Sequence, residues 1–128
     1  MPFAERLAEQ IPSPTPNAFS DACFKAATQA VLDTVGVTLA GAVSETAKII
    51  ARTTPLGYGP CHIIGGSQQC DPLNAALLNG TAAHALDFDD MTQNMMGHPS
   101  VALVPALFAL GEQINASGRE ILKSYLIG

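Results

Sequence analysis

Charged and aromatic side chains are scarce in this sequence of 128 residues. The charged residue types make up 13% of it, the aromatic residues 5%, and tryptophan is absent. The formal net charge is −5, which argues against a nucleic acid or an anionic membrane as partner, because both are negatively charged. Apolar residues nevertheless reach 48%. They are mostly small or aliphatic, a composition that favours closely packed helices.

The sequence also lacks a long hydrophobic segment. No apolar run approaches the roughly 20 residues that a membrane-spanning helix needs, and the acidic N-terminus is not typical of a secretory signal. The cysteines, Cys23, Cys61 and Cys70, are odd in number and lack the spacing of metal ligands, as is typical of free thiols in a reducing compartment. We therefore expect a cytoplasmic protein.

So little charge on a short chain has a consequence for its surface. A domain of this size has a large surface relative to its volume and needs polar side chains to cover it. The predicted helices carry more apolar surface than the few polar residues can cover. We therefore expect the chain to bury apolar surface against a partner subunit or against the rest of a longer polypeptide.

Helical periodicity and capping signals predict an all-α chain. The predicted helices cover residues 3–11, 16–41, 44–53, 72–86, 101–113 and 118–128. Thr15 with Pro16, and Asp71 with Pro72, each resemble an N-cap followed by a first-turn proline. Pro105 lies inside a predicted helix, which must kink or break there.

The remaining segments are predicted as turns and loops. Residues 54–70 are rich in glycine and proline, with 61–64 extended, and residues 87–97 show no clean period. Ser117 with Glu120 three residues later is a capping box that opens the last helix. No internal repeat is visible, so we expect one domain or part of one.

Ionisable side chains are concentrated in and beside the predicted loop 87–97. His84, Asp87, Asp89, Asp90 and His98 all lie within a stretch that has no lysine or arginine from Thr53 to Gly118. Loops held by helices at both ends commonly carry catalytic groups. A carboxylate placed beside an imidazole can move a proton near neutral pH, and Asp87 with His98 is the candidate pair.

Other interpretations of these residues stay open. The three aspartates could gather a divalent cation through oxygen ligands, although no second acidic cluster follows. Asp89 and Asp90 are more typical of turn residues that accept hydrogen bonds from backbone N–H groups. His84, on the apolar face of an alanine-rich helix, is more typical of a hydrogen-bonded core histidine. The methionines Met91, Met95 and Met96 could line an apolar pocket or simply fill gaps.

Two motifs resemble a known family. NGTAAHALDFDD at 79–90 followed by HPS at 98–100, together with LDTVGVTLAGA at 32–42, is similar to the MmgE/PrpD family of 2-methylcitrate dehydratases, cis-aconitate decarboxylases and iminodisuccinate epimerases. The resemblance implies that residues 1–128 form the bundle-like N-terminal part of a helical domain, with the family's α/β lid domain absent from this chain. It also implies a homodimer, no cofactor and no catalytic metal, and a role in propionate metabolism.

The resemblance implies roles for individual residues. Asp87 and His98 would be catalytic, and His84, Met91 and Thr92 would contact the substrate. Decarboxylases of the family place a threonine directly after DFDD, where this chain has Met91, and the loop before His98 is one residue longer here. These departures weaken cis-aconitate decarboxylation and are nearer to the dehydratase- or epimerase-like branches. We expect dehydration of a di- or tricarboxylic acid by proton transfer beside a carboxylate.

The same resemblance leaves alternatives. An epimerase or isomerase of the family, or a non-catalytic remnant that acts as a dimerisation module, would carry the same motifs. The family's lysines come after the region that this chain covers, so we expect the chain alone to hold only part of an active site.

Overall fold

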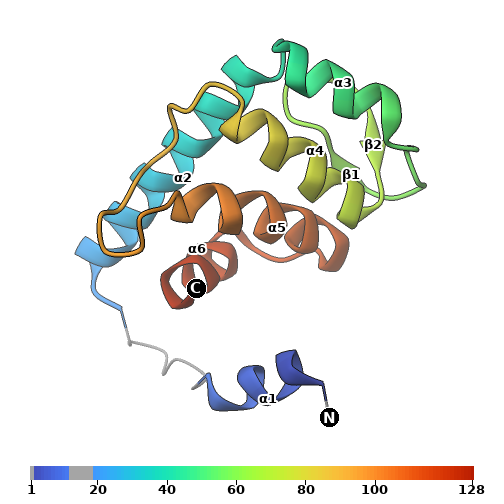
Figure 1. Ribbon diagram of the computed structural model, residues 1–128. Coiled ribbons are helices and arrows are strands. Elements are labelled where there is room, and N and C mark those ends of the chain that lie inside the picture. The colour runs from blue at the N-terminus through green and yellow to red at the C-terminus, as the bar shows by residue number, and fades with distance from the viewer. Residues whose placement is uncertain (1, 12–18) are drawn as a thin grey trace.

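The fold is helical, as the sequence predicts. The computed structural model describes residues 2–11 and 19–128. In chain order its elements are α1 (Phe3–Gln10), α2 (Asp21–Gly41), α3 (Glu45–Thr53), β1 (Cys61–His62), β2 (Gln69–Cys70), α4 (Pro72–His84), α5 (Pro99–Ile114) and α6 (Gly118–Ile127) (Figure 1). The two short strands form one antiparallel pair.

Helix α4 lies at the centre of the packing. It contacts α5, α2 and α3, while α6 packs on α2 and α5 (Figure 1). Its buried face consists mostly of alanine, including Ala75, Ala82 and Ala83. At the end of α2, a Cβ on Gly41 would lie 2.0 Å from the carbonyl oxygen of Ala82, so only glycine permits this approach. The small-residue composition is therefore used for close helix packing.

The helix starts follow the local capping signals. The backbone N–H groups of Leu73 and Asn74 donate to Asp71 Oδ1, each at 3.1 Å, and the capping box of Ser117 and Glu120 is formed. The predicted start at Thr15 and Pro16 lies outside the described residues; within them α2 begins at Asp21, with Ser20 as its N-cap.

The predicted end of α4 is wrong, and of the kink or break predicted at Pro105 the break does not occur. Helix α4 ends at His84, two residues before the predicted end, because Ala85 and Leu86 form a turn. Helix α5 runs without a break from Pro99 to Ile114 although Pro105 lies inside it. Pro105 is buried and faces Gly80 of α4, whose Cβ position lies 3.8 Å from the proline ring, so tertiary packing holds the proline within the helix.

Two buried cysteines anchor the glycine- and proline-rich segment 54–70 in the core. Cys61 of β1 pairs with Cys70 of β2, and both are buried beside Ala75, Leu78 and Ala109. The Cys61 thiol donates to the Ala109 carbonyl at 3.1 Å. Burial raises the pKa of both thiols, so they act as small core residues, and both are free thiols as predicted.

Large apolar side chains lie mostly outside this small core. Leu32 of α2 is 70% exposed, Leu73 of α4 82% and Phe88 77%. This exposure agrees with the expectation that the chain buries surface against another segment or subunit, which stays a prediction. In the described ranges no single helix is long and apolar enough to cross a membrane; α2 and α3 reach that limit only as a pair bent by 82°.

Candidate active site

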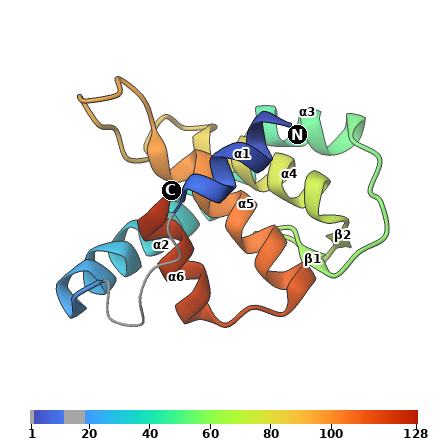
Figure 2. The same cartoon turned by 90° about the horizontal axis from the view of Figure 1, so that it is seen from below.

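The candidate site lies on the loop that joins α4 to α5. This loop projects beyond the neighbouring ends of the two helices (Figure 2). Asp87 has a φ of 55°, a left-handed conformation that aspartate tolerates better than most residues. Farther along, Thr92 and Gly97 form an antiparallel bridge with N–H···O distances of 3.0 and 3.4 Å. The predicted loop is thus an ordered turn that returns the chain to His98.

A buried carboxylate joins the two histidines of the motifs. Asp89 has no exposed side-chain surface, and its carboxylate oxygens lie 3.0 and 3.1 Å from Nδ1 of His84. Its Oδ2 is also 3.2 Å from Nδ1 of His98. The two imidazole rings meet edge to face, with centroids 4.7 Å apart. The sequence-based interpretation of Asp89 as a cap for backbone N–H groups therefore missed its main contacts.

The second carboxylate near His98 is Asp87. Its Oδ1 lies 3.5 Å from Nε2 of His98, longer than an ordinary hydrogen bond, and its side chain is 78% exposed. Nδ1 of His98 has no aligned hydrogen-bond partner among the described residues, although Asp89 is only 3.2 Å away. We treat that contact as electrostatic, because the distance is short but the direction is wrong. His98 thus lies between two carboxylates without a hydrogen bond to either.

His84 differs from the core histidine that the sequence predicts. Its side chain is half exposed, at 52%, because α4 ends at this residue. A carboxylate only accepts hydrogen bonds, so Nδ1 of His84 donates to Asp89, while its Nε2 takes no part in these contacts. His84 is therefore a surface residue held in place by a buried acid.

Asp90 has a structural role at the start of α5, as the sequence suggests. It accepts a hydrogen bond from the Ser100 N–H at 3.1 Å and another from the Ser100 hydroxyl. The hydroxyl of Tyr125 in α6 lies 2.7 Å from Ser100 Oγ. Because the Ser100 proton goes to Asp90, Tyr125 must donate to Ser100. This chain of hydrogen bonds fixes the helix end that carries His98.

The predicted substrate contacts on the loop have different surroundings. Thr92 takes part through its backbone, and no hydrogen bond joins its hydroxyl to the two histidines within the described residues. Met91, Met95 and Met96 are each at least 60% exposed, so they form part of the loop surface and do not line a closed pocket. The substrate-binding roles of Met91 and Thr92 stay predictions.

The cluster of metal-type ligands differs from the one weighed in the sequence. The three aspartates are not brought together, because Asp90 turns to Ser100. Instead His84, Asp87, Asp89 and His98 each offer a ligand atom, and these atoms lie within 4.8 Å of one another. No sequence signal groups Asp87 with Asp89, because the left-handed backbone of Asp87 breaks any regular alternation of side chains.

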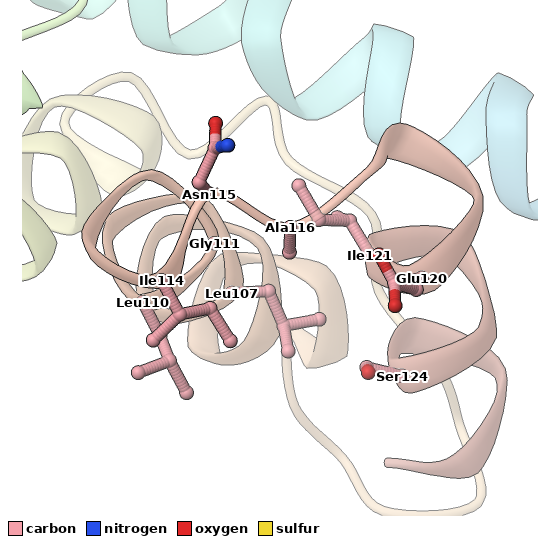
Figure 3. Close-up of a pocket in the computed structure, with 9 residues that line it drawn as sticks. All are labelled: Leu107, Leu110, Gly111, Ile114, Asn115, Ala116, Glu120, Ile121 and Ser124. Atoms are coloured by element: carbon pink, nitrogen blue, oxygen red, sulfur yellow. The ribbon is translucent and has the colours of Figure 1, made fainter.

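A separate cavity of about 210 Å³ lies between the C-terminal part of α5 and α6 (Figure 3). Apolar side chains such as Leu107, Ile114 and Ile121 line much of it. Glu120, its charged residue, is bound to the backbone and hydroxyl of Ser117. With its only carboxylate engaged, this cavity offers no free group for chemistry, and we attribute it to helix packing.

Comparisons with known proteins agree with the motifs. Residues 5–128 match the family described as the MmgE/PrpD N-terminal domain. The chain is 29% identical to cis-aconitate decarboxylase from Homo sapiens over 85% of its length, and 29% identical to the enzyme from Mus musculus over 88%. It is 35% identical over 64% of its length to a cis-aconitate decarboxylase-like protein from Aspergillus oryzae.

These relatives are much longer than the present chain. The matched region covers 24% of the human and mouse enzymes and 17% of the Aspergillus oryzae protein. The family match, in contrast, covers nearly the whole chain. The chain therefore belongs to the MmgE/PrpD family, whose N-terminal domain it matches over residues 5–128.

Proposed function

We propose that the protein containing this chain is a lyase that dehydrates a di- or tricarboxylic acid, with His98 as its acid–base group. The observation that supports this most directly is the position of His98 between Asp87 and Asp89. Neither ring nitrogen of His98 is in an aligned hydrogen bond to a carboxylate, so the imidazole is available to take up a proton. Asp87, exposed and close to Nε2, orients the ring or accepts the proton in turn.

The proposed reaction transfers two protons. His98 takes a proton from the carbon next to a substrate carboxylate, and the electron pair of that C–H bond forms a C=C bond. The C–O bond on the neighbouring carbon breaks at the same time, and its oxygen leaves as water after receiving a proton. The half-exposed His84 lies beside His98 and would deliver that second proton in its protonated form.

Binding such a substrate requires positive charge that this region lacks. No lysine or arginine occurs between Thr53 and Gly118, and substrate carboxylates are usually held by such cations. We therefore propose that the cations come from another part of the polypeptide or from a second subunit of a homodimer. This chain then supplies the proton-transfer half of the site.

Decarboxylation is the second candidate reaction. The names of the human, mouse and Aspergillus relatives favour it, whereas Met91 directly after the DFDD motif favours dehydration. The two reactions are distinguished by their products, since cis-aconitate decarboxylation releases CO2 and dehydration of 2-methylcitrate does not. An epimerase would exchange the α-hydrogen with deuterated water without losing water, and a non-catalytic remnant would do none of these.

The role of His98 is tested by His98→Ala in the intact protein. We expect kcat to fall by about 10²–10⁴-fold, the usual contribution of general acid–base catalysis, with an unchanged unfolding temperature. His62→Ala is the matched control, because its imidazole pairs with Glu112. Turnover close to wild type in His98→Ala would overturn the proposed role.

A further inference from the structure

The four side chains of the loop site form a mixed set of nitrogen and oxygen ligands. His84, Asp87, Asp89 and His98 place one ligand atom each within 4.8 Å of the others. Two imidazoles with carboxylates suit Zn²⁺ and related transition metals, whereas Mg²⁺ and Ca²⁺ prefer oxygen ligands alone. The donor types alone therefore favour one class of cation.

The spacing of these atoms also suits a single ion. Ligands about 2.0–2.1 Å from a tetrahedral Zn²⁺ lie about 3.3 Å apart. Asp89 lies 3.0 Å from Nδ1 of His84 and 3.2 Å from Nδ1 of His98. Only small movements are needed for these three groups to surround one ion. Asp87 is the candidate fourth ligand, since its ligand atom lies within 4.8 Å of those of the other three residues.

Charge and hydrogen bonding favour a cation at the same place. Asp89 is a fully buried carboxylate, and burying a carboxylate is costly unless a positive group compensates it. Nδ1 of His98 is buried and has no aligned hydrogen-bond partner within the described residues. An ion beside Asp89 would compensate the charge, and a rotation of the His98 ring would direct the unpaired nitrogen at it. The exposed side chains of Asp87 and His84 leave an access path for the ion.

We propose that His84, Asp89 and His98, with Asp87 as fourth ligand, bind one divalent transition-metal ion of the Zn²⁺ class. With the ion on Nδ1, the proton of the neutral His98 ring lies on Nε2, so neither ring nitrogen has a lone pair left to accept a proton. The ion is therefore a reversible inhibitor of proton transfer and a clamp that joins the end of α4 to the start of α5. The binding itself does not depend on the proposed lyase reaction.

The test is a Zn²⁺ titration of the intact protein by calorimetry, with Co²⁺ as a spectroscopic probe. We expect one equivalent of Zn²⁺ to bind and to raise the unfolding temperature, as any ligand of the folded state does. Tetrahedral Co²⁺ should show intense visible absorption. In a His84→Asn/His98→Asn double variant the affinity should fall by about 100-fold or more, beyond the cost of losing a residue that only orients a ligand.

Two control variants separate this site from other donors. His62→Asn removes an exposed imidazole at another site, and Cys23→Ser removes a partly exposed thiol; both should bind Zn²⁺ like the wild type. Absence of binding in the wild type would overturn the proposal, as would unchanged affinity in the double variant. A protein that binds Zn²⁺ as expected but turns over no carboxylic acid would contradict only the proposed lyase function.

Discussion

Two imidazoles at opposite ends of α5 face carboxylates, but in different ways. At the C-terminal end, hydrogen bonds occupy both ring nitrogens of His62. Glu112 accepts from the His62 backbone N–H at 2.7 Å and lies 2.6 Å from Nδ1 of the ring. Nε2 of Gln69 lies 2.9 Å from Nε2 of His62. Since the amide of Gln69 donates to Nε2, Nδ1 carries the proton that Glu112 accepts. Both ring nitrogens of His62 are satisfied.

At the N-terminal end, His98 has two carboxylates nearby and no aligned hydrogen bond to either. The His62 imidazole therefore has a structural role, whereas the His98 imidazole is available for chemistry. The His62 pair attaches β1 to α5 and has nothing left to offer a ligand. An imidazole beside an acid is therefore weak evidence of function until the state of both ring nitrogens is known.

The variant Asp89→Asn is expected to have the largest effect and tests the His98 end of α5. The amide keeps the shape of the side chain but replaces one of its two acceptor oxygens with an N–H donor. One of the two imidazoles that face an acceptor in the wild type therefore faces a donor in the variant. We expect the unfolding free energy to fall by about 1–3 kcal/mol, the cost of a buried unsatisfied polar group. If His98 is the acid–base group as proposed, kcat in the intact protein should fall while KM stays unchanged, because Asp89 contacts the ring of His98 from behind.

Steady-state kinetics and denaturant unfolding measure both effects of Asp89→Asn. Asp33→Asn is the control, since Asp33 is an exposed residue of α2 and its variant should behave like the wild type. A variant with lower stability and unchanged kcat would make Asp89 a purely structural residue, and the contrast between the two ends of α5 would weaken.

A smaller effect is expected for Tyr125→Phe. This change removes the hydroxyl that donates to the buried Ser100, while Ser100 still donates to Asp90. The lost hydrogen bond should reduce the unfolding free energy by about 1 kcal/mol, measured by urea denaturation. Tyr58→Phe, at a fully exposed tyrosine, should change nothing. Equal stability of the two variants would mean that Tyr125 does not support the start of α5.

Local signals are sufficient to predict most of the fold. Ser44, Asp71 and Ser117 cap their helices through hydrogen bonds to residues two or three positions away, and such short-range contacts are visible in sequence. The family motifs likewise predict that Asp87 and His98 lie together, and their side chains are 3.5 Å apart. Helix caps can therefore be predicted from the local sequence, and the Asp87–His98 pair from the family motifs.

Contacts between distant residues could not be predicted. The sequence favours a turn role for Asp89, because nothing in a single sequence indicates that its carboxylate is buried between two imidazoles. Helix α4 ends at His84, followed by a turn at Ala85 and Leu86 and a left-handed Asp87, which the helical period does not reveal. His62 and Glu112 are fifty residues apart, and a lone histidine in a turn-rich segment carries no sign of its partner.

The variant Glu112→Gln is expected to have the smallest effect and tests the His62 end of α5. Glu112→Gln leaves one acceptor oxygen for two donors of His62, at a place where the His62 and Glu112 side chains are 59% and 37% exposed. Solvent replaces much of the lost interaction, so the unfolding free energy should fall by only about 0.5–1 kcal/mol, measured by urea denaturation. Turnover and Zn²⁺ affinity should match the wild type, because both nitrogens of His62 serve only to attach β1 to α5. Adding Gln113→Glu, on the neighbouring exposed residue, restores the net charge of this helix end and so separates the lost hydrogen bond from the change in charge. If Glu112→Gln lowered kcat as much as Asp89→Asn, the two imidazole sites would not differ in the way that their hydrogen bonds indicate.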